Sequence, residues 1–240
     1  MKYTYLKLVI LFFTLTPQIF AQQNFDKVDA HALKVGKLDS TNMGTIATLL
    51  TKPFAEKVDK ARAIYTWIAN NIVYDVKAAS KEQTDKNTTA EVLLYRKAVG
   101  IGFATLFQDM CSSAGIRCLT ADGHIKRNTE EMGDDELEKN HSWAVVQLGL
   151  SPDTWHYVDV ALGSGYVDEQ MKVFTKKISG NYFFADKAIF NWQHFPDNPA
   201  WKLDAGPKNK TAFLALPIIR ASAYDWQLKK FTPELAVQKA

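Results

Sequence analysis

Two segments with helical periodicity, followed by three short runs of strand character, constrain the fold of this chain most strongly. Apolar residues recur at helical spacing from Glu56 to Ile72 and again from Gly100 onward, so each segment is predicted to form an amphipathic helix. Gly115 then ends the second helix. The strand runs cover residues 116–125, 142–148 and 155–161. Helices first and strands later predict an α+β domain, with helices packed on an antiparallel sheet.

The remaining segments are predicted around this core, which spans residues 56–180. Residues 22–55 form an N-terminal arm, and residues 181–240 form an aromatic-rich C-terminal extension that packs on the core. A polar loop is expected over 77–88, followed by a short helix over 91–95 capped by Thr88 or Thr89. An exposed acidic loop is expected over 130–138.

The N-terminus has the pattern of a secretory signal peptide. Lys2 and Lys7 precede a short apolar run, and the small residue Ala21 precedes a polar stretch. The apolar run is too short for a membrane span of about 20 residues, so cleavage after Ala21 is favoured over an uncleaved anchor. The mature chain would have 219 residues (240 − 21), no stable membrane span and a charge of +1, since 27 basic residues face 26 acidic ones. We expect export to a periplasm or the exterior.

Charge and cysteine content exclude several classes of protein. The net charge of +3 is too balanced for a nucleic-acid binder that works through bulk charge. Two cysteines cannot form a thiolate zinc cage, and the histidines lack a metal-binding spacing, so neither a metal nor another cofactor is expected. Whether Cys111 and Cys118 form a disulfide is left open by the sequence, as is the oligomeric state.

The order of helix, strand and strand matches the way thiol catalysis is assembled. A cysteine at a helix N-terminus has its thiolate stabilised by the helix dipole and by an imidazolium. His141, just before one strand, and Asp159, within the next, are the candidate base and its orienting carboxylate. Antiparallel pairing of these strands would bring the two side chains within hydrogen-bonding reach.

These residues lie in segments that resemble the transglutaminase-like superfamily, in particular its kyphoscoliosis-peptidase-like branch and bacterial relatives. The resemblance covers most of the mature chain, with its segments in the family's order. They are KARAIYTWI (60–68) with NIVYD (71–75), RKAVGIGFA (96–104), AGI (114–116), NHSW (140–143), YVDV (157–160), and YFF (182–184) with HFPDNPAW (194–201). It implies a papain-like α+β core whose Cys, His and Asp triad performs amide cleavage or cross-linking.

The chain departs from this pattern at the nucleophile. Where the family reads Gly-Val-Cys-x-Gly-Tyr-Ala, residues 98–104 read AVGIGFA, so Gly100 occupies the cysteine position. His141 and Asp159 keep the places of the other triad members. The leading interpretation is therefore an inactive family member that binds a peptide or protein ligand of the cell envelope or exterior, with Gly100, Gly102 and Trp143 at the binding site.

Other interpretations of this site stay open. His141 and Asp159 could activate water or another nucleophile, because a glycine at the helix start leaves a small void beside backbone N–H donors. Gly100 could also be a variant position of an active enzyme. Cys111 and Cys118 are expected to be structural residues of the core. The other histidines are expected to be ordinary structural hydrogen-bonding residues: His31, His124, His156 and His194.

Overall fold

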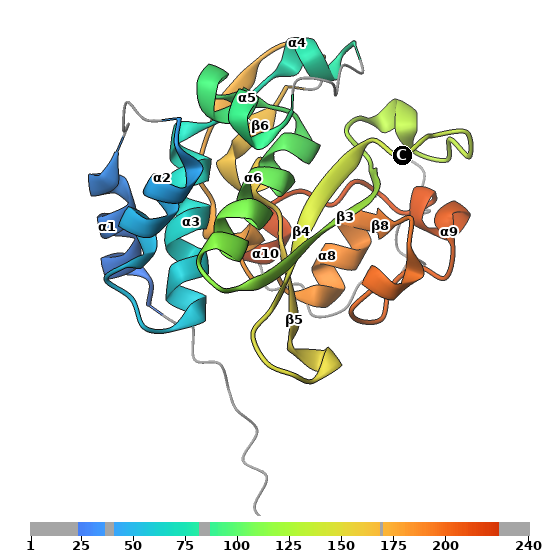
Figure 1. The fold of residues 1–240 in the computed structure, drawn as a ribbon. Coiled ribbons are helices and arrows are strands. Elements are labelled where there is room, and N and C mark those ends of the chain that lie inside the picture. The colour runs from blue at the N-terminus through green and yellow to red at the C-terminus, as the bar shows by residue number, and fades with distance from the viewer. Residues whose placement is uncertain (1–23, 37–40, 82–86, 169, 226–240) are drawn as a thin grey trace, which may run out of the picture.

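The computed structural model describes residues 24–36, 41–81, 87–168 and 170–225 (Figure 1). The predicted signal peptide, residues 1–21, lies outside these ranges. Within them, no helix combines the length and the apolar character needed to cross a membrane.

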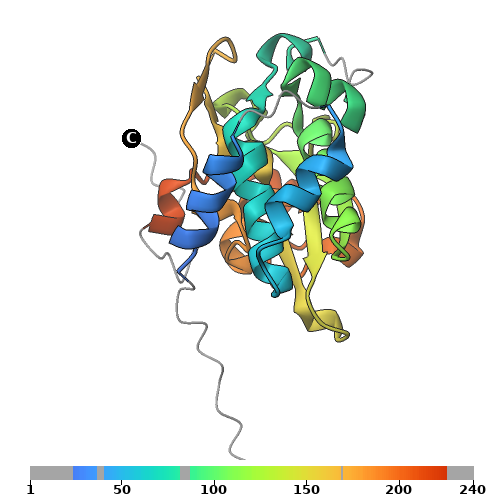
Figure 2. The ribbon, with the colours of Figure 1, turned by 60° about the vertical axis from the view of Figure 1, so that its left-hand side comes forward.

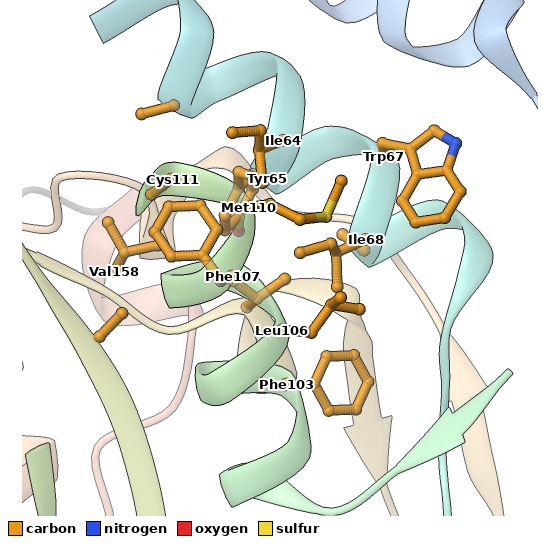
Figure 3. Close-up of a cluster of buried hydrophobic side chains, with 14 of the residues drawn as sticks. Ile64, Tyr65, Trp67, Ile68, Phe103, Leu106, Phe107, Met110, Cys111 and Val158 are labelled. Carbon is orange, nitrogen blue, oxygen red and sulfur yellow. The ribbon is translucent and has the colours of Figure 1, made fainter. Parts of the chain in front are cut away.

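A layer of helices packs around one central helix, α3 (Lys57–Asn71). Helices α1 (Asp26–Val35), α2 (Met43–Thr51) and α6 (Gly100–Ser113) all contact α3, and Figure 2 shows the N-terminal helices side by side. Side chains around almost the whole of α3 are buried, so the helix carries apolar residues on several faces. The large buried side chains of α3 meet those of α6 (Figure 3).

A four-stranded antiparallel sheet lies against α6 in the order β5-β4-β3-β8. Its strands are β3 (Arg117–Ile125), β4 (His141–Gln147), β5 (Trp155–Val158) and β8 (His194–Pro196). The side chains of one sheet face, including Cys118, Ala144 and Val158, join the core shared with α3 and α6. The opposite face carries Trp143 and Tyr157, which pack in a second cluster with Phe190. Alternation along each strand therefore serves two hydrophobic cores.

Shorter elements connect these layers. Helix α5 (Thr89–Tyr95) begins with a capping box between Thr88 and Glu91, and strand β1 (Val73–Tyr74) pairs in parallel with β2 (Lys97–Ala98). The other short helices and strands are α4 (Val76–Ala79), α7 (Val160–Ser164), β6 (Gly165–Val167), β7 (Phe174–Lys176), α8 (Lys187–Gln193), α9 (Lys210–Leu214) and α10 (Ser222–Asp225). Single 3-10 turns cover Thr129–Glu131, Pro152–Thr154, Gly180–Tyr182 and Pro199–Trp201.

The predicted α+β class, with helices packed on an antiparallel sheet, is confirmed. Both long helices form within one residue of the predicted limits, and Gly115 has a φ of +74° just after α6. Thr88, not Thr89, caps the helix that follows it.

Two local predictions are wrong, and a third holds except at two residues. The segment 77–88 does not begin as a loop, because Asp75 accepts a hydrogen bond from the backbone N–H of Ala78 and starts the single turn α4. The third strand run ends at Val158 rather than Ala161, because Asp159 caps α7. The acidic loop over 130–138 is exposed as predicted except at Leu137 and at Glu131, whose carboxylate accepts hydrogen bonds from the backbone and side chain of Arg127.

The C-terminal region takes part in the central sheet. Strand β8 lies beyond residue 180, yet it pairs with β3 in the same sheet as the predicted core strands. Helix α8 precedes it and supplies Phe190 to the second core cluster. The described part of the predicted C-terminal extension is thus continuous with the sheet.

The two cysteines are free thiols in the core. Cys111 lies on α6 among Phe107, Tyr65 and Val158 (Figure 3), and both thiols are buried. Burial raises the pKa of the Cys111 thiol well above its usual value, and its contact with Cys118 adds to the increase. A buried, protonated thiol is a poor nucleophile, so the prediction that these cysteines are structural is consistent with their surroundings.

Candidate active site

Gly100 is the first residue of α6 and is packed against His141. A Cβ atom placed on Gly100 would lie 2.7 Å from Nδ1 and 3.0 Å from Cε1 of the His141 ring. The predicted void at the glycine is therefore absent, because the imidazole lies too close to leave room for a side chain unless the ring shifts. In the first turn of α6, the backbone N–H groups of Gly102 and Phe103 donate to the carbonyl oxygen of Val99, whereas those of Gly100 and Ile101 have no acceptor within the helix.

His141 begins β4 and is held from one side. Its Nε2 lies 2.7 Å from Oδ2 of Asp159, while Nδ1 faces Gly100 and has no hydrogen-bond partner among the described side chains and backbone. The side chain is 3% exposed. This orientation, with Nε2 on the carboxylate and Nδ1 toward the helix start, is the one a thiol–imidazole pair would require.

Asp159 lies between β5 and α7 and is completely buried. Its Oδ1 accepts a hydrogen bond from the backbone N–H of Leu162 at 2.9 Å, so the residue caps α7 while Oδ2 contacts His141. Burial by itself would raise the pKa of Asp159, but the attraction and hydrogen bonds of His141 and His194 outweigh it and hold the pKa well below its usual range. Sequence analysis thus predicted the contact between His141 and Asp159 correctly.

His194 is the site residue that the sequence did not reveal. It is fully buried, and its Nε2 lies 2.9 Å from the same Oδ2 of Asp159 that His141 contacts. Its other nitrogen, Nδ1, lies 3.2 Å from the carbonyl oxygen of Phe190. Asp159 and His194 are 35 residues apart, so only the pairing of β8 with β3 brings them together.

Gly123 allows this approach across the sheet. It pairs with His141 on one side and with Pro196 on the other, so it lies between the strands that carry the two histidines. A Cβ on Gly123 would lie 2.2 Å from the Phe195 carbonyl oxygen and 2.8 Å from Cη2 of Trp143. Glycine is required here because the backbone of β8 and the indole of Trp143 both approach too closely for any side chain.

We expect Gly123→Ala to destabilise the fold by about 1–3 kcal/mol, because the added methyl must push β8 away from β3. Urea unfolding followed by circular dichroism measures the change. The matched control is Gly44→Ala in α2, where the nearest atom to an added Cβ is 3.5 Å away. That replacement should be neutral or stabilise by up to about 1 kcal/mol. Equal losses in the two variants would contradict the role assigned to Gly123.

A cavity of about 430 Å³ opens beside Gly100 and His141. Its walls come from α4, β1, the start of α6, the loop before β4, and β3. The lining residues are Tyr74, Ala78, Ala79, Val99, Gly100, Ile101, Asp122, Arg127, Leu137, Glu138, Lys139, Asn140, His141 and Ser142. Two basic and two acidic side chains line it, so no single sign of charge dominates the cavity.

No cysteine lines this cavity, and its two hydroxyl groups are poorly suited to replace one. The Ser142 hydroxyl donates a hydrogen bond to Asp122 at 2.7 Å, on the sheet face opposite His141. Burial raises the pKa of the Tyr74 phenol, which therefore stays protonated at neutral pH. The site has an oriented imidazole and a carboxylate, but no nucleophile between the imidazole and the helix start.

Two residues predicted to bind the ligand, Gly102 and Trp143, do not line the cavity. A Cβ on Gly102 would lie 2.4 Å from Oδ1 of Asn87, so this glycine accommodates the side chain that bonds to the N–H of Val99. Trp143 is 1% exposed and packs in the second core cluster. Gly100 alone of the three predicted binding residues lies at the cavity.

Among the described residues, one group has the composition of a metal site. The ligand-type atoms of His141, Asp159 and His194 all lie within 4.8 Å of one another. Sequence spacing predicted no metal, and spacing alone does not show this cluster. Each imidazole lies at hydrogen-bond distance from the shared carboxylate oxygen, so the group is also satisfied by protons alone.

Comparisons with known proteins show similarity to the transglutaminase-like superfamily. Residues 45–160 match the model of the transglutaminase-like superfamily. The chain is 34% identical over 190 residues to the mouse protein named kyphoscoliosis peptidase, with 79% of this chain and 28% of that protein covered. The human protein of that name is 32% identical over 192 residues, with 80% and 28% covered. A Caenorhabditis elegans protein named Lim and transglutaminase domain protein ltd-1 is 26% identical over 220 residues, with 85% and 29% covered. The chain therefore spans less than a third of the length of these relatives.

Proposed function

Residues 45–160 belong to the transglutaminase-like superfamily, and we propose that this chain is an exported, catalytically inactive member that binds a peptide or protein in the family's cleft. The observation that carries the proposal is the contact between Gly100 and His141. The position that would hold a nucleophile has no side chain, and a Cβ there would lie only 2.7 Å from Nδ1 of the imidazole.

Three features support retention of the cleft as a binding site. The cavity of about 430 Å³ is within the range of small-ligand sites and is large enough for two or three residues of a peptide. His141 Nδ1 and the N–H groups of Gly100 and Ile101 lie at one end of the cavity, where they can bind a backbone amide or a similar polar group. Apolar residues such as Ile101 and Leu137 line other parts of the cavity.

A working hydrolase or acyl transferase is the second candidate. The 2.7 Å contact between His141 and Asp159 favours it, because an oriented imidazole with a free Nδ1 toward a cavity can act as a general base. Without a thiolate, the base would have to activate water, which is a much weaker nucleophile toward an amide.

A binding and turnover experiment separates the two candidates. We expect the mature chain, residues 22–240, to enrich sequences from a random peptide library displayed on phage, and to show neither casein hydrolysis nor incorporation of a fluorescent amine. Ile101→Arg should abolish the enrichment because the longer charged side chain fills the cavity. The control is Leu150→Arg, since Leu150 is fully exposed and outside the cavity.

Turnover that disappears in His141→Ala would overturn the inactive assignment and establish the second candidate. Peptide enrichment that survives Ile101→Arg would place binding elsewhere on the surface. Export has its own test: N-terminal sequencing of the protein made from the full chain should begin at Gln22, and an intact Met1 would contradict the proposal.

A further inference from the structure

We infer that His194 is a positioning residue: together with Asp159 it holds one shared proton, which neutralises the carboxylate and keeps His141 neutral, with its Nδ1 a hydrogen-bond acceptor toward the cavity. The inference concerns the protonation of three buried side chains. It bears on the proposed function, but its test uses the protein without any ligand.

Both ring nitrogens of His194 face oxygen atoms. Its Nε2 faces the Asp159 carboxylate at 2.9 Å, and its Nδ1 faces the Phe190 carbonyl at 3.2 Å. Both partners are acceptors if Asp159 is ionised. A neutral imidazole carries only one N–H, so one ring nitrogen would point a lone pair at an acceptor oxygen. A second proton on the ring gives both nitrogens an N–H to donate, and this removes the conflict.

His141 cannot provide this proton while it makes its own contact. Its Nε2 also lies on Oδ2 of Asp159, at 2.7 Å, and donates to it in the neutral form with the proton on Nε2. The Asp159 and His194 pair must therefore hold two protons besides the one on His141: one on Nδ1 of His194, and one between its Nε2 and Oδ2. The three residues together then carry no net charge.

Burial supports this count. Asp159 and His194 are both 0% exposed, and a carboxylate in such a place is very costly unless a positive charge or a proton compensates for it. Burial is the largest effect on His194 and lowers its pKa; the hydrogen bond and charge of Asp159 oppose this without cancelling it, and a charged His141 would lower the pKa further. We infer a protonated His194 ring from the hydrogen-bond geometry, because a carboxylate and a carbonyl both face the ring.

The C-terminal end of helix α8 also favours a protonated His194 ring. His194 follows its last residue, Gln193, and the ring bonds to the carbonyl of Phe190 in the final turn. The ring is stacked on the Phe190 ring with centroids 3.7 Å apart and an angle of 4°. Positive charge is favoured at the C-terminal end of a helix, and the stacking fixes the ring plane.

Among the residues that the structure describes, no other side chain on the neighbouring elements compensates Asp159 in this way. The phenols of Tyr65, Tyr74 and Tyr182 are within electrostatic reach of Asp159, and burial raises the pKa of each, so all three stay neutral. The charged residues near His141 line the cavity and are Asp122, Arg127, Glu138 and Lys139. Arg127 pairs with Glu131 at 2.5 Å, and Lys139 lies 3.8 Å from Asp122, so these charges are largely balanced.

The consequence for the cleft is a change in the role of His141. In a thiol–imidazole pair the ring is an imidazolium, stabilised by its aspartate. Here the aspartate is already neutralised by His194, so the neutral ring offers a lone pair at Nδ1. The cavity thereby presents an acceptor beside the N–H donors at the start of α6.

Nuclear magnetic resonance of the histidine ring nitrogens tests the inference directly. In the unchanged protein at pH 7, we expect His194 to have two protonated or proton-sharing nitrogens, and His141 to have one protonated nitrogen, Nε2, and one acceptor nitrogen, Nδ1. A His194 ring with one ordinary N–H, or a His141 ring protonated at both nitrogens, would overturn the inference. This measurement needs no variant and stands even if a substituted protein fails to fold.

His194→Gln adds a readout that a purely structural role would not change. The glutamine keeps a donor near Asp159 but has no titratable proton, so the whole carboxylate charge acts on His141. We expect the ratio of imidazolium to imidazole at His141 to rise about tenfold or more at pH 7, since an adjacent opposite charge shifts such an equilibrium by one to three powers of ten.

The matched control is His124→Gln. His124 is also a buried histidine of this sheet with an aspartate partner, Asp197, at 3.2 Å. Its replacement should leave the nitrogen signals of His141 unchanged. An unchanged His141 in His194→Gln, or an equal change in both variants, would show that His194 does not set the state of His141. The proposed peptide binding could still hold in either case, so the two proposals fail separately.

Discussion

Gly100→Cys should gain a thiol that reacts with iodoacetamide at pH 6 about tenfold or more faster than an ordinary cysteine. The new side chain would start α6, beside backbone N–H groups and near Nδ1 of His141. Both surroundings favour the thiolate, and cysteines in such positions have pKa values of roughly 3.5–7.5 instead of about 8.5. The imidazole must first retreat by a few tenths of an ångström, because the added Cβ lies 2.7 Å from Nδ1.

Labelling can be read without interference from the natural cysteines, because Cys111 and Cys118 are buried. The unchanged protein should therefore take up no label while folded. The double variant Gly100→Cys with His141→Ala provides the matched comparison, since it has the thiol but lacks the imidazole. The ratio of the two alkylation rates is the measurement.

Equal alkylation rates in the single and double variants would contradict this expectation. They would mean that His141 no longer activates a thiol at position 100, and that the cleft has diverged beyond the loss of one side chain. Amide hydrolysis by Gly100→Cys would go further than the labelling result, because it requires the cleft to orient a substrate as well.

Asp159→Ala should destabilise the fold on the order of 3–5 kcal/mol, the cost of removing one member of a buried charged pair. Three contacts disappear together: the two to His141 and His194, and the cap on α7 through Leu162. The midpoint of urea unfolding measures the loss, and an unchanged slope shows that the transition remains two-state.

Asp197→Ala is the matched control for this change. Asp197 also pairs with a histidine of the sheet, His124, but its side chain is 50% exposed. Its removal should cost less than about 1 kcal/mol, because water and salt screen an exposed pair. Similar losses in the two variants would contradict the special position of Asp159.

The contribution of Asp159 should also depend on pH in a defined direction. Its pKa in the folded protein lies well below its usual range, whereas the unfolded chain has the ordinary value of about 3.9. Between these values the unfolded state binds more protons, so stability rises with pH. The contribution is complete above about pH 5 and is lost as the pH falls through the folded pKa. The difference between the unchanged protein and Asp159→Ala should therefore shrink in acid, and a constant difference would oppose this assignment.

Local pattern was sufficient for the long elements of this fold. Helix α3 and helix α6 follow from apolar periodicity, and the end of α6 follows from Gly115. The contact between His141 and Asp159 also follows, because β4 and β5 are sequential antiparallel strands joined by the short connection 148–154. Element boundaries that side-chain caps set were not predicted. Asp75 starts a short helix at a predicted loop, and Asp159 starts another within a predicted strand.

The partners of the site from distant segments could not be predicted. His194 comes from a strand that pairs with β3 across about 70 residues of chain, and nothing in the spacing of the histidines indicates this. Gly102 and Trp143 lie near the predicted site in sequence. A Cβ on Gly102 would face Asn87, however, and the indole of Trp143 packs in the second core cluster. Nearness in sequence to Gly100 or His141 therefore did not predict which residues line the cavity.

The sequence by itself determined the fold class, the family and the absence of a thiol at position 100, because these depend on residue type, order and local periodicity. Only the tertiary structure decided that the His141 ring occupies the space above Gly100, and that His194 shares Asp159 with it. The first result arises from the packing of α6 on the sheet, and the second from the pairing of β8 with β3, which are far apart in the chain. Such pairing depends on packing of the whole sheet, including the clearance at Gly123, and no local pattern encodes it.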